Sequence, residues 1–494
     1  MKLANILDSV ELKKIDKTIF DYEIDDIKIN HEQVQSGDMF IAMKGVNFDG
    51  NDFVTSALKN GAQVIVSEKE FPYANVVVVK DARKAYAQIC KNFFEKACDK
   101  LKIIGVTGTN GKTTTANIIS NILKENGENV ATIGTLGVSF NTQIINTGMT
   151  TPDPYQLHKL FSKMLDEGVK YAVMEVSAHA LALDKMEGVK FEIGVLTNIT
   201  EDHLDFFKNM DNYAKAKISF FSPKFMKMGI VCGENEYGKE LMFNPKVPII
   251  CYGKGIGYDV NGKNISYSFK GCEFDCEFLD ENIKISSNLV GEYNVENLLA
   301  AIAVTRSIGV PSSTIQKSIK NLAPVEGRFN VINLKNKNII IDYAHTPDGL
   351  EKVLSTAKKL SNNKLVCIFG CGGNRDRQKR PIMGKIACKY ADDVILTSDN
   401  PRFEDPYKIM EEVAVGFTKP CKEICDRKEA INYALKKYKD KTTIVIAGKG
   451  AEEYQEINGV KYPFSDFQVV YEAYKESLKP FKKNKSYPFE EENY

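Results

Sequence analysis

The sequence predicts an α/β protein of about three domains. The chain has 494 residues, which is more than one hydrophobic core usually serves. Apolar residues make up 43% of it, enough for a sizeable core in each domain. Short apolar runs alternate with helical patterns over most of its length, as expected for βαβ units around parallel sheets.

The first two domains are expected over residues 1–99 and 100–326. In the small N-terminal α/β domain, strands are predicted at residues 39–43, 64–66 and 76–79, and a helical stretch ends near Cys98. In the central domain, strands are predicted at residues 103–106, 172–174, 193–196 and 229–232. Residues 256–289 have the pattern of short antiparallel strands and are expected at one edge of the central sheet.

A third, doubly wound domain is predicted over residues 327–480, followed by a polar tail at 481–494. Its strands are predicted at residues 339–341, 365–369, 394–396 and 443–447. Ligands of such sheets bind beyond the carboxyl ends of the strands. The segments that fall there are Asp342, residues 370–375, 399–402 and 448–452.

A glycine-rich segment at residues 105–115 joins a predicted strand to a predicted helix, an arrangement that cradles phosphate. Lys112 supplies a mobile charge and the Thr113 hydroxyl can complete a Mg²⁺ shell, although Val106 stands where the strict motif has its first glycine. ATP is the expected ligand, and a glycine-rich turn without a ligand is the alternative. The expected ATP-binding residues here are Gly108, Thr109, Asn110, Gly111, Lys112, Thr113 and Thr114.

Polar side chains follow two other strands of the predicted central sheet. Glu175 comes directly after residues 172–174, and Asn198, His203 and Asp205 come after residues 193–196. A carboxylate and an imidazole beside a phosphate loop suit Mg²⁺ held against the β- and γ-phosphates. The alternatives are an ion-paired carboxylate and a structural histidine.

Four ordered segments are similar to motifs of the Mur ligases: residues 107–113, 174–181, 197–205 and 342–348. The resemblance extends from about Gly37 to Asp466 and is greatest to members that add the third residue of the peptidoglycan stem peptide. It implies three domains that bind a UDP substrate, ATP and an amino acid, in that order. It also implies that a carboxylate of UDP-N-acetylmuramoyl-L-alanyl-D-glutamate attacks ATP and that an amine then displaces phosphate from the acyl phosphate.

Roles for further residues follow from the resemblance alone. Lys217 matches a lysine that is carbamylated to N6-carboxylysine, although a helical lysine taken alone would be expected on the solvated surface. The implied catalytic residues are Lys112, Glu175, His203 and Lys217, and the implied metal ligands are Thr113, Glu175, His203 and Lys217. Further implied nucleotide contacts are Asn297, Arg328, Asp342 and His345. The implied UDP-substrate contacts are Thr150, Thr151, Ser177, Lys185 and Lys217.

The identity of the added amino acid is predicted from charge. The run Asp399, Asn400, Pro401 and Arg402 resembles the motif of members that add meso-diaminopimelate, whose far end carries a carboxylate that lysine lacks. Arginine offers a carboxylate a bidentate fork. Further contacts implied by the resemblance are Arg375, Gly448 and Glu452. An ordinary turn after a strand is the alternative.

The chain departs from the family pattern at several positions. Asn30, His31 and Glu32 stand where an Asp-Ser-Arg run is usual, and Lys185 replaces an arginine; in the third domain Asn374 replaces an aspartate and Ala451 a histidine. A divergent ligase with a modified acceptor and a folylpolyglutamate-synthetase-like ligase therefore remain alternatives. A phosphate-loop binding protein without ligase activity is the third.

Composition limits the partners. A net charge of +1 argues against nucleic acid, and no apolar run approaches the length of a membrane span. The N-terminus lacks a signal-type apolar segment, so we expect a cytoplasmic location. We also expect a monomer. The eleven cysteines contain no C-x-x-C pair, which favours reduced, buried thiols.

Overall fold

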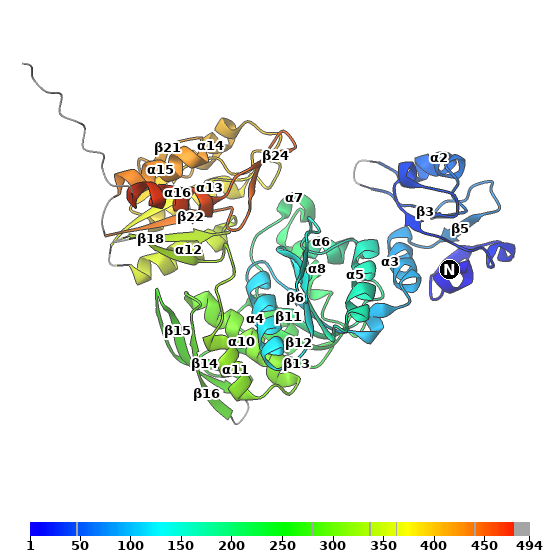
Figure 1. Cartoon of the computed structure of the whole chain (residues 1–494), viewed down its shortest axis with the longest axis horizontal. Helices are drawn as coiled ribbons and strands as arrows, with labels where there is room; N and C mark the ends of the chain where they lie inside the picture. Colours follow the sequence, from blue (N-terminus) through cyan, green and yellow to red (C-terminus); the bar gives the residue numbers. More distant parts are fainter. Residues whose placement is uncertain (46–47, 279–280, 335–336, 362, 439–440, 479–494) are drawn as a thin grey trace, which may run out of the picture. The chain divides into compact units, whose positions relative to one another are not determined.

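The structure is a computed structural model that describes all residues except 46–47, 279–280, 335–336, 362, 439–440 and 479–494. The predicted tail at 481–494 lies outside the described residues. The chain divides into two units, Met1–Ala323 and Pro324–Tyr494, and both combine helices with parallel-rich sheets (Figure 1). The α/β class is therefore confirmed, while the boundaries of three separate domains stay a prediction.

The N-terminal part of the first unit has its own sheet, with strand order β1-β5-β4-β3-β2. All neighbours in it are parallel except β1 and β5. The strands are β1 (Leu12–Lys14), β2 (Ile27–Lys28), β3 (Met39–Ala42), β4 (Val64–Ser67) and β5 (Val76–Val79). The helices are α1 (Leu3–Ile6), α2 (Val54–Lys59) and α3 (Ala82–Phe93).

An eleven-stranded sheet forms the rest of this unit, in the order β16-β15-β14-β13-β12-β11-β6-β10-β7-β8-β9. Its parallel strands are β6 (Lys102–Thr107), β7 (Val130–Gly134), β10 (Tyr171–Glu175), β11 (Phe191–Leu196), β12 (Met226–Cys232), β13 (Ile249–Lys254) and β14 (Val260–Ser268). Antiparallel strands extend both edges: β8 (Gly137–Phe140), β9 (Gln143–Ile145), β15 (Gly271–Phe278) and β16 (Glu281–Ser287). The predicted antiparallel insertion at one edge is confirmed.

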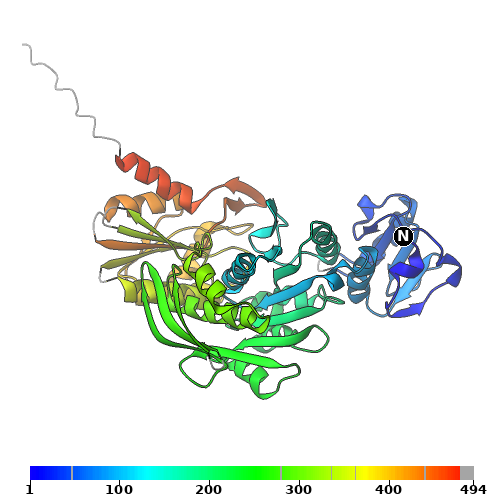
Figure 2. The same cartoon turned by 60° about the horizontal axis from the view of Figure 1, so that its bottom comes forward.

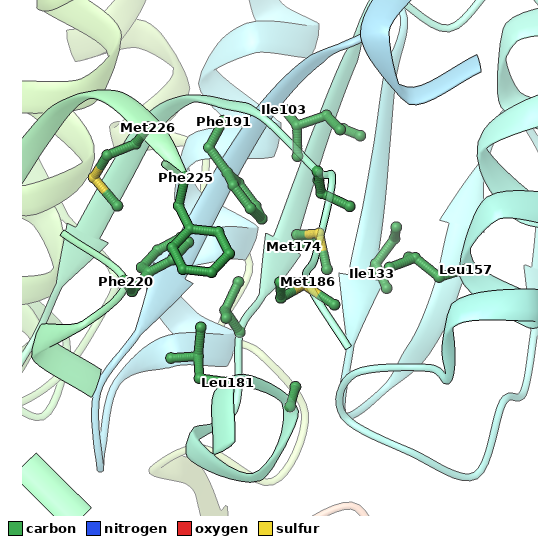
Figure 3. Packing of buried hydrophobic residues seen from close by; sticks show 14 of the residues in the cluster. Ile103, Ile133, Leu157, Met174, Leu181, Met186, Phe191, Phe220, Phe225 and Met226 are labelled. Atoms are coloured by element: carbon green, nitrogen blue, oxygen red, sulfur yellow. The ribbon is translucent and has the colours of Figure 1, made fainter. Parts of the chain in front are cut away.

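Helices cover both faces of this sheet because its strands are apolar on both sides. Along β6, Ile103 packs into one core and Ile104 into the other. Figure 3 shows the first core, where Phe191, Phe220 and Met174 meet. The helices are α4 (Lys112–Glu125), α5 (Pro154–Asp166), α6 (Ala178–Ala182), α7 (Leu204–Phe207), α8 (Met210–Ile218), α9 (Glu236–Phe243), α10 (Glu292–Ser307) and α11 (Ser312–Lys320). Figure 2 shows α10 and α11 alongside the strands β14 to β16.

The second unit contains a six-stranded sheet in the order β17-β18-β22-β19-β20-β21, parallel except between β17 and β18. The strands are β17 (Asn330–Leu334), β18 (Lys337–Asp342), β19 (Lys364–Phe369), β20 (Asp393–Leu396), β21 (Lys422–Glu423) and β22 (Thr442–Ala447). The helices are α12 (Pro347–Leu360), α13 (Lys379–Tyr390), α14 (Pro406–Ala414), α15 (Arg427–Lys437) and α16 (Asp466–Leu478). A separate hairpin consists of β23 (Tyr454–Ile457) and β24 (Val460–Pro463).

Local sequence explains where several elements begin or turn. Helices α5, α12 and α14 each start with a proline preceded by an aspartate or threonine whose side chain accepts a backbone hydrogen bond. Asn458 and Gly459 both have positive φ, +50° and +77°, as a two-residue hairpin turn of type I′ requires between β23 and β24.

The expectation for the cysteines holds in part. All eleven are free, and nine are buried, but Cys421 and Cys425 are only half-buried. None of the helices in the described part of the chain combines the length and the apolar character that a membrane crossing needs.

Candidate functional site

The predicted phosphate loop joins β6 to α4, and two of its glycines are required by its geometry. Gly108 has φ +146° and Gly111 has φ +87°, values that side-chain-bearing residues rarely adopt. A Cβ at Gly108 would overlap Thr197 Oγ1, and a Cβ at Gly111 would overlap Asn297 Oδ1. The turn is therefore held close both to the end of β11 and to α10, and no larger residue fits at either position.

The segment after β11 anchors this loop. Asn198 Oδ1 accepts a hydrogen bond from Asn110 N at 3.0 Å, and Asn198 Nδ2 donates to Asn110 O at 3.0 Å. Thr109 N donates to Asn198 O at 2.8 Å, and Thr109 Oγ1 donates to Thr200 O at 3.0 Å. Sequence reasoning placed Asn198 at a strand end but missed this anchoring role, which depends on the parallel pairing of β11 with β6.

Lys112 and Thr113 lie at the start of α4, as predicted. Lys112 Nζ donates to Gly108 O at 2.9 Å and to Thr109 O at 2.8 Å, so the ammonium lies over the loop. Thr113 Oγ1 donates to Glu175 Oε1 at 2.9 Å, and Glu175 is buried at the end of β10. The structure thus brings the predicted phosphate-binding cation and two predicted metal ligands to one end of the sheet.

The donor set beside the loop fits Mg²⁺. Thr113 and Glu175 offer oxygen atoms, the ligands that Mg²⁺ prefers. Within the described ranges, no group of three or more histidine, cysteine, aspartate or glutamate side chains could hold a metal by itself. Mg²⁺ is usually bound by one or two protein oxygens together with water and substrate phosphates.

Lys217, on α8, is almost completely buried, with 1% of its surface exposed, so the default expectation of a solvated helical lysine is wrong. Its Nζ donates to Gly108 O at 2.7 Å and lies 4.7 Å from the centre of the Tyr213 ring. Burial, with a smaller contribution from the nearby Lys112 charge, holds the pKa of the Lys217 ammonium well below its usual range. Burial of Lys217 beside the loop thus favours the uncharged form of its amine.

His203 follows β11 and also lies near Tyr213, with the two ring centres 6.2 Å apart. Its Nε2 is 3.3 Å from Asp202 Oδ2, and the His179 ring centre is 4.7 Å away. His203 has φ +56°, a left-handed conformation that turns the chain into α7. Lys217 and His203 thus both lie near the Tyr213 ring.

Asn297 and the predicted UDP-substrate residues are also close to these elements. Asn297 Oδ1 accepts from Thr115 Oγ1 at 3.2 Å, beside Gly111. Thr151 Oγ1 donates to Glu175 O at 2.9 Å and accepts from Ser177 N at 3.0 Å, so these two residues lie next to the carboxylate.

Two further UDP-substrate positions are Thr150 and Lys185, of which only Lys185 departs from the family pattern. Thr150 Oγ1 is 3.1 Å from Thr135 Oγ1, and Lys185 is half-buried with Nζ 3.9 Å from Met149 Sδ. Burial lowers the pKa of Lys185. The Asn30 side chain accepts from Glu32 N at 3.0 Å and so begins a short 3₁₀ helix at His31–Gln33.

In the second unit, Asp342 ends β18 and is buried. It accepts hydrogen bonds from Ala344 N and Phe329 N, both at 2.7 Å. Burial raises the pKa of Asp342 to about 6, although the Arg328 charge opposes this shift. Arg328 lies 4.5 Å over the Tyr343 ring, and His345 Nδ1 is 2.8 Å from Tyr343 O. The three nucleotide contacts predicted in this unit therefore cluster at one strand end.

Most of the predicted amino-acid residues form a second cluster in this unit. Asn400 Nδ2 donates to Glu452 Oε2 at 2.9 Å, and a Cβ at Gly448, whose φ is +118°, would lie 2.5 Å from Asp399 Oδ2. Arg402 Nη1 donates to Gly373 O at 2.8 Å. Pro401 is buried, whereas Arg375 is exposed and donates to Asn374 O at 3.3 Å.

Sequence reasoning missed two charged residues of this cluster. Lys449 is completely buried and its Nζ donates to Glu452 Oε2 at 2.7 Å, and Glu456 Oε2 is 3.2 Å from Arg402 Nε. Lys449 stands between two glycines directly after a buried strand, which is a signal that could have been used. Glu456 is brought to the cluster by a hairpin turn and had no such signal.

Comparisons with known proteins agree with the resemblance found in the sequence. Residues 106–305 match the Mur ligase middle domain, residues 327–450 the Mur ligase glutamate ligase domain, and residues 23–94 the Mur ligase family catalytic domain. A relative from Aquifex aeolicus (strain VF5) is 42% identical over 451 residues, which are 90% of this chain and 92% of that protein. It is named UDP-N-acetylmuramoyl-L-alanyl-D-glutamate–2,6-diaminopimelate ligase.

Solved structures are similar over much of the chain. One structure of a ligase with that same name has a TM-score of 0.70 and 32% identity, and it covers 97% of this chain and 99% of its own. Folylpolyglutamate synthase from Mycobacterium tuberculosis, complexed with ADP and AMPPCP, has a TM-score of 0.63 and 16% identity and covers 74% and 92%. The second likeness is one of fold alone.

Asp342 gives a prediction of pH dependence. Its folded pKa of about 6 lies above the ordinary value of 3.8, so the folded chain binds more protons than the unfolded chain between these values. Stability therefore falls as pH rises from about 4 to about 6, by about 3 kcal/mol from this group. Asp342→Asn should remove this slope, as measured by urea unfolding of both proteins at pH 4 and pH 7. A difference in unfolding free energy that stays the same at both pH values would contradict the assignment.

Proposed function

This chain belongs to the Mur ligase family, and on that premise we propose that it joins meso-2,6-diaminopimelate to UDP-N-acetylmuramoyl-L-alanyl-D-glutamate with ATP hydrolysis to ADP and phosphate. The observation that carries this proposal is the joint presence of a phosphate loop with Glu175 bonded to Thr113 and of the Asp399 to Arg402 run in the second unit. The relative from Aquifex aeolicus, matched over 90% of this chain, carries a name that states this reaction.

The chemistry requires two anions to come together. A carboxylate oxygen of the dipeptide must attack the γ-phosphorus of ATP, which forms an acyl phosphate and releases ADP. The amine then attacks the acyl carbon, which forms the amide bond and releases phosphate and a proton. Lys112, with Nζ held over the loop by Gly108 O and Thr109 O, would move to the phosphates and offset their charge. The N–H groups at the start of α4 would orient the same phosphates.

Thr113 and Glu175 would hold Mg²⁺, which when bound neutralises phosphate charge and polarises the transferring group. Of these two, Glu175 also accepts from Thr135 N at 2.9 Å, which keeps the carboxylate oriented toward α4. Thr151 Oγ1 donates to the backbone carbonyl of Glu175 and accepts from Ser177 N, which supports the proposed role of both residues at the acceptor substrate.

Lys217 is proposed to be carbamylated. An uncharged lysine amine adds to CO₂, forming a nitrogen–carbon bond and losing one proton, and burial lowers the pKa of Lys217 in the direction that this step needs. The product is an anion, which replaces the repulsion between the Lys112 and Lys217 charges by an attraction; the two lysines share Gly108 O as an acceptor. Together with His203, which also lies near Tyr213, this carbamate would supply ligands for a second Mg²⁺.

The acceptor side is where the chain could differ from its relatives. Asn30 caps a short 3₁₀ helix and Lys185 replaces an arginine, so a divergent ligase with a modified acceptor stays the alternative function. A cytoplasmic location, a monomeric state and the lack of a nucleic-acid partner stay predictions from the sequence.

The proposed reaction predicts a strict substrate requirement. Purified protein should release phosphate from ATP only when both UDP-N-acetylmuramoyl-L-alanyl-D-glutamate and an amino acid are present. In a panel of amines, diaminopimelate should be preferred over lysine, because Arg402 can bind its far carboxylate. Equal turnover with lysine would defeat the diaminopimelate assignment. Activity with glutamate and a folate would replace the proposal by a folylpolyglutamate-synthetase-like function.

If Lys217 is carbamylated, replacing it should cause a loss of activity that added bicarbonate does not reverse. Lys217→Ala should lose most activity, because the proposed ligand is absent, and added bicarbonate should not restore it. Lys215→Ala is the matched control, since Lys215 is exposed two residues earlier on the same helix and should retain activity. After equilibration with ¹³C-bicarbonate, a carbamate carbon resonance should be present in the Lys215→Ala protein and absent from the Lys217→Ala protein. Near-normal turnover by Lys217→Ala would reject the carbamate.

A further inference from the structure

The β23–β24 hairpin holds the backbone of the predicted amino-acid motif. Arg402 N donates to Glu456 O at 3.0 Å, and Asn458 N donates to Arg402 O at 2.7 Å. Glu456 N donates to Asn400 Oδ1 at 2.9 Å. Arg402 has φ +52°, an uncommon conformation for a residue with a side chain, and its two backbone bonds to the hairpin stabilise it there. The hairpin therefore sets the direction in which the Arg402 side chain extends from the backbone.

The Arg402 side chain is fixed by the same hairpin. Its Nε lies 3.2 Å from Glu456 Oε2, and its Nη1 donates to Gly373 O at 2.8 Å. The two side chains are only 19% and 22% exposed, so solvent screens the pair less than it would a surface ion pair. One ion pair and one hydrogen bond, made by different nitrogens of the guanidinium, restrict its orientation.

A second charged pair in the cluster is built in the same way. Lys449 Nζ donates to Glu452 Oε2 at 2.7 Å and to Asn400 Oδ1 at 3.1 Å. Two of the charges expected to face the incoming amino acid thus have a countercharge: Arg402 has Glu456, and Glu452 has Lys449. The four formal charges sum to zero, and a site with no net charge suits a ligand end that is itself neutral.

We propose that Glu456 is a specificity-determining residue that positions Arg402 and offsets its charge. The site then favours an end group that carries a carboxylate and an ammonium together over one that carries a carboxylate alone. A zwitterionic end meets both Arg402 and the acidic groups Glu456 and Glu452 favourably, whereas a purely anionic end is repelled by Glu456. This inference rests on the proposed function of the Asp399 to Arg402 run.

The test compares two amino acids that differ only at the far end. Diaminopimelate carries both groups there, and 2-aminopimelate keeps the carboxylate but lacks the ammonium. In Glu456→Gln, which preserves shape and the backbone bonds of residue 456, the ratio of kcat/KM for diaminopimelate to that for 2-aminopimelate should fall about tenfold. The KM for ATP should not change. A ratio equal to that of the wild type would overturn the inference.

Two further variants separate this role from a structural one. Glu453→Gln removes the same charge from an exposed position just before the hairpin and should keep the wild-type ratio. Glu456→Asp keeps the charge and should keep the wild-type ratio of kcat/KM values, even if turnover of both amino acids decreases. An equal loss for both amino acids in Glu456→Gln would mark Glu456 as a structural support and overturn the specificity role.

The outcome also distinguishes this inference from the proposed function. Wild-type protein that does not turn over diaminopimelate would overturn the proposed function, and this inference with it. Wild-type protein that prefers diaminopimelate, together with an unchanged ratio in Glu456→Gln, would overturn this inference alone.

Discussion

The close packing of the β6–α4 turn against its neighbours is the constraint on which the candidate site depends. Gly108 and Gly111 let the turn pass within contact distance of Thr197 and Asn297, where no side chain fits. This approach brings the start of α4 to Glu175. It also lets the Asn198 side chain form hydrogen bonds with both the backbone N–H and the backbone carbonyl of Asn110. It also turns the carbonyl of Gly108 toward α8, where Lys217 binds it.

Two amines on one carbonyl explain the electrostatics beside the loop. Lys112 and Lys217 both donate to Gly108 O, at 2.9 and 2.7 Å, and only Lys217 is almost fully buried. Burial and repulsion from Lys112 both lower the pKa of Lys217 and so disfavour its charged form. The same short turn thus places a cation suited to phosphate beside a buried lysine.

The sequence was sufficient for features that are encoded locally. Strands with apolar runs, the phosphate turn and the start of α4 were all predictable, because periodicity and the glycine pattern are properties of adjacent residues. Val106, which replaces the first glycine of the strict motif, is part of β6 and packs in the core. Lys217, Asn198 and Glu456 could not be placed in this way. The burial of the first comes from packing around α8, and the contacts of the other two come from strand pairing and a hairpin far along the chain.

The most direct test of the account is calorimetric titration of MgATP into the wild type and two glycine variants. Gly111→Ala places a methyl group against Asn297 at a position with positive φ. Gly127→Ala is the matched control, because Gly127 has a similar φ of +82° but its methyl group would point into open space. We expect Gly111→Ala to weaken MgATP binding by about tenfold or more and Gly127→Ala to leave it unchanged. Equal affinity in all three proteins would contradict the claim that this turn holds the nucleotide.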